Sequence, residues 1–242
     1  MKTWQKIGAL TLFVLLLFAV RIYFIWRERN EPIVQQPKVA ERQLTQDDIV
    51  QPRKLYIDSL ESAKALNGKP VWIQAGYSLD YYPYAGHRID FAHRTGFLPG
   101  AQQLQIQDII TEKVPADLAT RVPHGDKQVF AVFKLPNDDK EYATAIGFIQ
   151  GSDSTYYCDQ IFYYDDPHTM YNYWGPKVWA AIDQHTAIPG MNELQTAMAL
   201  GVVQQSESSD IGNRTVDYDA GGKKWSVTFQ HDKATVVKQD QD

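Results

Sequence analysis

The sequence predicts an α+β fold carried on an N-terminal transmembrane helix. Three observations lead to this prediction: an apolar run near the amino terminus, short β-like runs in the middle, and helical spacing followed by a hairpin pattern in the last third. The chain has 242 residues, 44% of them hydrophobic and 12% aromatic, enough for a packed core. The predicted parts are a tail, an anchor, a linker, a β-rich domain and an α/β module, at residues 1–6, 7–26, 27–53, 54–170 and 171–238.

The apolar run covers residues 7–26. As a helix it would be about 30 Å long, which is the thickness of the hydrocarbon core of a bilayer. Arg21 lies near its end and can extend to the headgroups, while Tyr23 and Trp26 are suited to the interface. The alternative is a cleavable signal peptide that starts with the basic residues 1–6, but no small-x-small cleavage site follows the run. We therefore predict an uncleaved anchor in the lipid bilayer.

The tail at residues 1–6 is expected in the cytoplasm, because two lysines and the amino terminus are costly to translocate. The protein would then be single-pass in the inner (cytoplasmic) membrane, with its domain on the periplasmic or extracellular side. Residues 27–53 are polar and contain Pro32, Pro37 and Pro52, which is typical of a linker.

The next part, residues 54–170, is predicted to be rich in strands. A short helix is expected at 55–66, ending at the turn signal Asn67-Gly68. Six β-like runs follow, separated by turn residues, at 70–75, 87–92, 103–110, 128–135, 141–149 and 156–164. Strands at this spacing predict a small antiparallel barrel or sandwich.

The last part changes to helical spacing. One helix is expected to begin at Pro176, because proline at the first helical position has no donor to lose. A second is expected over 192–200, with Gly201 after its end. A hairpin follows, in which alternation places Trp225 and Phe229 on one face, and this face is expected to pack against the two helices.

Within this part, residues 174–229 contain Gly190-Met191, Leu200-Gly201, Tyr218 and an aromatic strand at 225–229. In these residues the stretch resembles the small outer-membrane lipoprotein A family, which includes the smallest accessory lipoprotein of the β-barrel assembly machine. The resemblance covers about 56 residues. It implies two helices with an antiparallel sheet, and a role as a binding or scaffolding module in the cell envelope.

Charge and motifs exclude several functions. The formal charge is −5, and because residues 1–30 contribute +4, the remainder carries −9. An acidic surface repels phosphate backbones, so we expect no nucleic-acid partner. No glycine-rich dinucleotide or phosphate loop is present, and we expect no cofactor. Cys158 is the single cysteine and is expected to be a small buried apolar residue.

Two clusters are candidate sites. Asp165, Asp166 and His168 could offer two carboxylates and an imidazole to a metal or a polar substrate. The alternative, which we favour, is a turn in which an aspartate bonds its own backbone, because no known metal-ligand spacing is present and we expect no metal.

The second cluster is rich in tyrosine and could form a recognition surface, because aromatic rings give a large contact area at little entropic cost. The same residues could instead pack as a loop on a sheet. The cluster runs from 77 to 94 and contains Tyr77, Tyr81, Tyr82, Tyr84, His87, Asp90, His93 and Arg94. The candidate binding residues among them are Tyr81, Tyr82, Tyr84, His87 and Arg94.

These features predict a membrane-anchored envelope protein that acts as a non-enzymatic binding or assembly module for an envelope protein partner. The alternative is a membrane-tethered hydrolase or metal-dependent enzyme that uses Asp165, Asp166 and His168. If these three side chains meet His87 or His93 in one cleft, the enzyme is favoured; if they are spread over a turn, binding is favoured.

Overall fold

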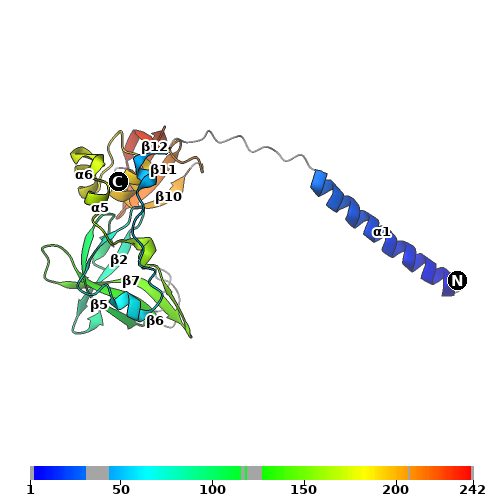
Figure 1. Ribbon diagram of the computed structural model, residues 1–242, viewed down its shortest axis with the longest axis horizontal. Helices are drawn as coiled ribbons and strands as arrows, with labels where there is room; N and C mark the ends of the chain where they lie inside the picture. The colour runs from blue at the N-terminus through cyan, green and yellow to red at the C-terminus, as the bar shows by residue number, and fades with distance from the viewer. Residues whose placement is uncertain (1–2, 31–43, 116–117, 119–126, 207, 241–242) are drawn as a thin grey trace. The chain divides into compact units, whose positions relative to one another are not determined.

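A computed structural model describes residues 3–30, 44–115, 118, 127–206 and 208–240, in two units, Met1–Thr45 and Gln46–Asp242. In the first unit, α1 (Thr3–Asn30) is one helix (Figure 1). Its apolar side chains between Leu12 and Trp26 are exposed. Within the described ranges, no helix combines the length and the apolarity that crossing a membrane requires. The transmembrane assignment of residues 7–26 therefore stays a prediction. Residues 31–43 of the predicted linker lie outside the described residues.

The second unit contains a nine-stranded antiparallel sheet in the order β3-β2-β7-β6-β5-β1-β9, with β4 paired to β2 and β8 paired to β7. The strands are β1 Pro70–Ile73, β2 Leu79–Ala85, β3 Arg88–Ile89, β4 Gly96–Leu98, β5 Gln103–Glu112, β6 Lys127–Lys134, β7 Glu141–Gln150, β8 Asp153–Tyr156 and β9 Phe162–Tyr163. Figure 1 shows β5, β6 and β7 side by side in the lower part of this unit.

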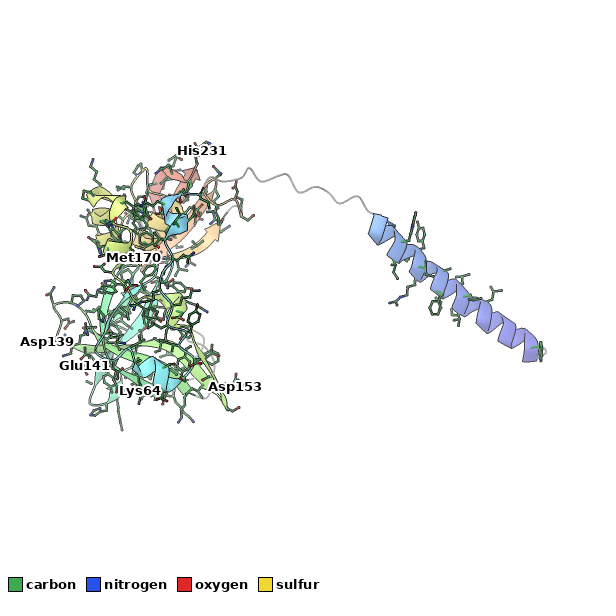
Figure 2. All side chains as sticks on the ribbon, in the orientation of Figure 1. Lys64, Asp139, Glu141, Asp153, Met170 and His231 are labelled. Atoms are coloured by element: carbon green, nitrogen blue, oxygen red, sulfur yellow. The ribbon has the colours of Figure 1, made fainter. Side chains whose placement is uncertain are left out.

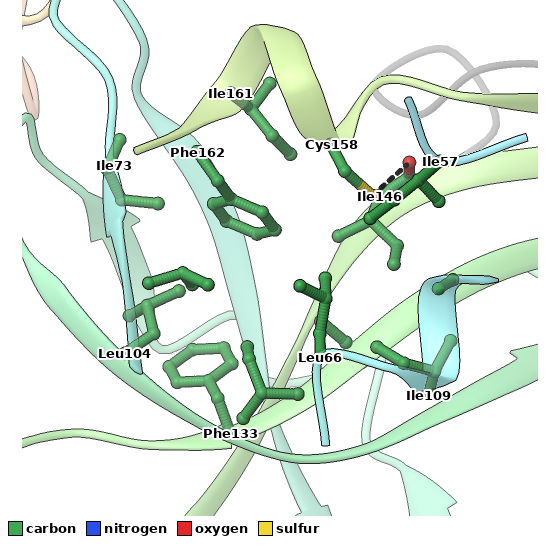
Figure 3. Close-up of a cluster of buried hydrophobic side chains, with 14 of the residues drawn as sticks. Ile57, Leu66, Ile73, Leu104, Ile109, Phe133, Ile146, Cys158, Ile161 and Phe162 are labelled. Atoms are coloured by element: carbon green, nitrogen blue, oxygen red, sulfur yellow. Dashed lines mark hydrogen bonds between the residues drawn. The ribbon is translucent and has the colours of Figure 1, made fainter. Parts of the chain in front are cut away.

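The centre of this sheet is buried on both faces. In β6, all residues from Gln128 to Phe133 are buried, as expected for a strand covered on each side. Phe133 lies in one apolar cluster, with Leu104, Ile146 and Phe162 (Figure 3). Phe130 faces a smaller cluster on the other side, with Tyr82, Ile89 and Ala143.

The predicted barrel is wrong, because the sheet stays open. Its end strands, β3 and β9, are two residues long and pair only with β2 and β1 among the described strands, so no ladder joins the two ends. Two predicted elements are shorter in the structure than expected. The strand predicted at 87–92 is β3 alone. The helix predicted at 55–66 is α3 (Leu60–Lys64), which begins after the capping residue Ser59.

The predicted strand at 156–164 is not continuous either. The chain leaves β8, forms the one-turn helix α4 (Cys158–Ile161) and only then enters β9. The Gln74 amide donates to the carbonyl oxygens of Asp159 at 3.2 Å and Phe162 at 2.8 Å. These bonds from a distant segment hold the turn in place.

The rest of the unit has helices followed by a four-stranded antiparallel sheet in sequence order. The elements are α5 Pro167–Met170, η1 Asn172–Trp174, α6 Pro176–Asp183, α7 Glu193–Leu200, β10 Val202–Ser206, β11 Thr215–Ala220, β12 Lys223–Gln230 and β13 Lys233–Gln239. The two predicted helices and the hairpin β11–β12 are confirmed, and β10 and β13 extend the hairpin on both sides. Trp225 and Phe229 share a buried cluster with Trp179 and Ile182 of α6, as predicted.

Helix α7 also packs closely against the large sheet. The Gly76 amide donates to the Ala197 carbonyl oxygen at 3.1 Å. A Cβ atom at Gly100 would lie 2.4 Å from the Met198 carbonyl oxygen, so only glycine permits this approach. The second core continues into the large sheet through Trp72 and Ala75. Both sheets therefore belong to one folded unit.

Candidate functional site

Asp165 and Asp166 have separate structural roles. The Asp165 carboxylate forms an ion pair with Arg53, with Nη2 and Oδ1 3.1 Å apart, and the same guanidinium donates to the Tyr164 carbonyl oxygen at 2.9 Å. Asp166 is the N-cap of α5, and its carboxylate accepts a hydrogen bond from the backbone N–H of His168 at 2.9 Å. This is the turn that the sequence favoured.

His168 faces an aromatic ring. Its imidazole stacks on Trp179 with centroids 4.0 Å apart, and its two nitrogens lie 3.1 Å from Asp166 and 3.6 Å from Asp183. Neither His87 nor His93 joins it: His93 pairs with Asp90 at 2.8 Å, and His87 lies in the β2–β3 turn. In the described part of the chain, no group of three His, Cys, Asp or Glu side chains is placed to hold a metal ion.

We expect substitutions in this turn to have small effects. Changing Asp166 to Ala should lower the free energy of unfolding by about 0.5–2 kcal/mol, the usual value of an N-cap, and Asp166→Asn by less because asparagine caps equally well. Asp165→Asn should change it by about 1 kcal/mol or less, because its ion pair is half exposed. Thermal melts measure the stability of each variant, and metal analysis of the purified protein measures any bound metal. Stoichiometric zinc or manganese that is lost in His168→Gln would contradict this interpretation and favour the enzyme.

The tyrosine cluster at 77–94 is mostly packing. Tyr82 is buried against Phe91, and Tyr84 packs on the same cluster. Tyr81 lies edge-on to Tyr142 with centroids 5.2 Å apart, and burial raises the pKa of Tyr81.

Arg94 is likewise held within its own surface. Its Nη1 donates to the Asp80 carboxylate at 3.1 Å, and its guanidinium lies over the Phe97 ring, 4.3 Å from the centroid. His87 is exposed at a turn. None of the five candidate binding residues lines the hollow beside β7, but Tyr77, the first residue of the same cluster, does.

A groove lies where two strands share one edge of β7. β2 pairs with residues 141–144 of β7 and β8 pairs with residues 147–150, while β6 occupies the whole opposite edge. Between the ends of β2 and β8 the surface opens into a hollow of about 380 Å³. Its walls come from β2, β7, β8 and α4, and it is lined by Tyr77, Ser78, Leu79, Asp80, Thr144, Ala145, Thr155, Tyr157, Gln160 and Ile161.

A second hollow of about 380 Å³ shares Tyr157 and Gln160 with the first. This second hollow is also lined by Tyr56, which is 78% exposed. The φ angle of Tyr56 is 53°, a strained value for a bulky residue. The Asp159 carboxylate fixes this conformation, because it accepts hydrogen bonds from the backbone N–H groups of Leu55 at 3.0 Å and Tyr56 at 2.7 Å. The two hollows together are called the α4 groove below.

The α4 groove is suited to contact and not to proton transfer. Burial raises the pKa of Tyr157, so its phenol stays neutral. Asp159 accepts a third hydrogen bond, from the Tyr164 hydroxyl at 2.7 Å, and Asp80 pairs with Arg94. The third aspartate that lines the groove, Asp58, accepts a hydrogen bond from the Ser62 hydroxyl at 3.3 Å. All three carboxylates are therefore engaged within the fold. The groove offers rings and hydrogen-bonding groups, the usual contacts of a binding surface.

Cys158, on α4, provides a test of how firmly this helix is packed. Figure 3 shows Cys158 among apolar side chains that include Ile57 and Ile146. The residue is 1% exposed, and burial raises the pKa of its thiol to about 12. At pH 8 the thiolate population should be roughly a thousandfold below that of a thiol with the ordinary pKa, so iodoacetamide should label the folded protein very slowly. Labelling followed by mass spectrometry, with the urea-unfolded chain as the fast control, measures this. Equally fast labelling of the folded chain would show that α4 opens readily.

The structure is an α+β unit with an open groove on its surface. A scan against protein-family models and searches of curated proteins and of solved structures found no match for this chain. The functional argument therefore depends on the side chains of this protein itself.

Proposed function

We propose that this chain is a membrane-anchored, non-enzymatic binding module of the cell envelope, and that it holds a segment of a partner protein in the α4 groove. The observation that carries the proposal is the groove itself, an open hollow at the shared edge of β7 with the exposed ring of Tyr56 beside it. Exposed tyrosines next to a hollow are typical anchor points of protein interfaces. The resemblance of residues 174–229 to small outer-membrane lipoprotein A, a family of binding and scaffolding modules, supports the same class.

Binding is favoured over the alternative enzyme by the separate roles of the acidic residues. Asp165 is paired with Arg53, Asp166 caps α5, and His168 stacks on Trp179. A hydrolase would need a nucleophile or a water positioned by a base, with these groups directed at one point. The arrangement of these three side chains supports a structural turn.

The anchor is proposed from residues 7–26, which lie in the single helix α1. We expect the chain to stay with the membrane fraction in carbonate extraction. We also expect that protease added to intact spheroplasts cuts the chain first within 27–53. Recovery of a soluble form that starts near residue 25 would favour a cleaved signal peptide. Protection in intact spheroplasts, with digestion only after lysis, would reverse the proposed orientation.

Site-specific photo-cross-linking tests the groove. A photoreactive amino acid at Gln160 should give one adduct of defined mass, and the substitution Thr155→Trp, which fills the groove, should abolish it. The control position is Asp139, in the exposed β6–β7 turn; Figure 2 shows it on the opposite side of this view from Asp153, at the start of β8. An adduct that also forms from Asp139, or that persists with Thr155→Trp, would contradict binding in the groove.

A further inference from the structure

A short surface helix carries a carboxylate that three donors surround. The helix is α2 (Gln46–Ile49), and none of its residues is buried. Asp47 Oδ1 accepts hydrogen bonds from the Tyr173 hydroxyl at 2.5 Å and from the Trp174 indole N–H at 2.7 Å. Its Oδ2 accepts a short hydrogen bond from the Asn192 amide. The donors come from η1 and from the residue that caps α7.

Two of these donors, Trp174 and Asn192, are held in place by contacts that do not involve Asp47. Trp174 is 8% exposed, and its ring stacks on Tyr171 with centroids 4.4 Å apart and lies 5.2 Å from the Trp179 ring. Asn192 is 9% exposed and is fixed by its capping bonds. Buried N–H groups directed at one point need an acceptor there, and a carboxylate is the acceptor that can take several such bonds at once.

Asn192 bonds both partners through different atoms of its amide. Its Oδ1 accepts a hydrogen bond from the backbone N–H of Gln195 at 2.8 Å, which caps α7, and its Nδ2 donates to Asp47. Serine, threonine or aspartate would also cap the helix but would offer no amide donor. Asparagine at this position therefore fits a residue that both caps α7 and binds a carboxylate.

We infer that Tyr173, Trp174 and Asn192 form a binding pocket for the carboxylate of an aspartyl peptide, and that residues 46–50 occupy it as an intramolecular strap. The strap holds the start of the folded unit against α7, while Val50 packs on the core that contains Trp174. The pocket is distinct from the α4 groove, and the inference does not rest on the proposed function.

Hydrogen exchange on the full-length chain tests the strap. In Asp47→Ala, and in Asn192→Asp, which keeps the cap but places a second carboxylate against Asp47, the amides of 46–50 should exchange at least tenfold faster. The control is Glu61→Gln, which removes an exposed acid from α3 and should leave the rates unchanged. Unchanged exchange at 46–50 in both variants would overturn the inference.

A peptide measures whether the pocket binds a carboxylate supplied from outside. The chain is labelled with 15N-tryptophan, and Trp174→Phe identifies the Trp174 indole N–H signal, which should shift in Asp47→Ala. A capped peptide with the sequence of residues 45–50 should shift this signal back in Asp47→Ala at saturating concentration. The same peptide with asparagine at position 47 should bind at least tenfold more weakly. Equal effects of the two peptides, or none from either, would show that the site is not a carboxylate pocket.

Discussion

Replacing Trp225 by alanine is expected to lower the free energy of unfolding by about 3–5 kcal/mol, the range for a buried aromatic side chain. Trp225 is 8% exposed and belongs to the cluster that joins β12 to α6 and α7. Alanine would leave a cavity between the sheet and the helices. This cavity cannot collapse, because the residues around it, Tyr218 and Val227 among them, are closely packed. For a unit of this size, each kcal/mol lowers the thermal midpoint by about 2–4 °C.

The matched variant is Trp225→Phe. The Trp225 indole N–H is buried and has no hydrogen-bond partner among the described residues, so phenylalanine removes no hydrogen bond. It should therefore lose less than half as much stability as alanine. Urea denaturation of the full-length chain, followed by circular dichroism, measures both. If the alanine variant unfolds at the wild-type midpoint, the face that bears Trp225 is not a core face.

The elements that the sequence predicted correctly are those with local signals. The start of α6 at Pro176 and the end of α7 at Gly201 follow from the backbone preferences of proline and glycine. The β11–β12 hairpin follows from alternation of buried and exposed residues. Each of these signals lies within the element that it defines.

The elements that were missed depend on contacts between distant residues. The run 156–164 is rich in aromatic residues, as in a strand, but the Gln74 amide donates to the carbonyl oxygens of Asp159 and Phe162 and holds the chain in the turn of α4. The α4 groove exists because β2 and β8 share one edge of β7, and strand order is not visible in any short segment. The tyrosines at 81–84 were predicted as a possible surface, yet β2 places Tyr82 in a core.

The pocket around Asp47 could not be predicted for the same reason. Asp47 lies in what reads as a polar linker, and its partners Tyr173 and Asn192 are 126 and 145 positions further along the chain. An aspartate in a polar segment carries no local sign that it will meet buried donors.

The second large effect is expected at the Glu193–Arg214 pair. Glu193 opens α7, and its carboxylate accepts hydrogen bonds from Arg214 Nε at 3.1 Å and Nη2 at 2.7 Å and from the Gly212 backbone N–H at 2.5 Å. The Arg214 side chain is only 16% exposed and the Glu193 side chain 11%, and the hydrogen bond between them raises the pKa of Arg214. The pair thus ties the β10–β11 loop to the helix.

Replacing Glu193 by alanine should lower the free energy of unfolding by about 3–5 kcal/mol, because it leaves a buried guanidinium without its counter-charge. The exposed pair Arg53–Asp165, whose side chains are 55% and 48% exposed, is the control and should contribute about 1 kcal/mol or less.

A double-mutant cycle with Arg214→Met tests the reason for this loss. Removing both charges and filling the space with an apolar side chain should restore much of the stability that Glu193→Ala loses, because no unpaired charge remains buried. We therefore expect the double variant to be more stable than Glu193→Ala alone, with a coupling free energy of at least about 1 kcal/mol. Urea titrations of the two single variants and the double variant give this value. If the losses simply add, the pair is not coupled, and the stability of the loop must come from the Gly212 hydrogen bond and the packing around it.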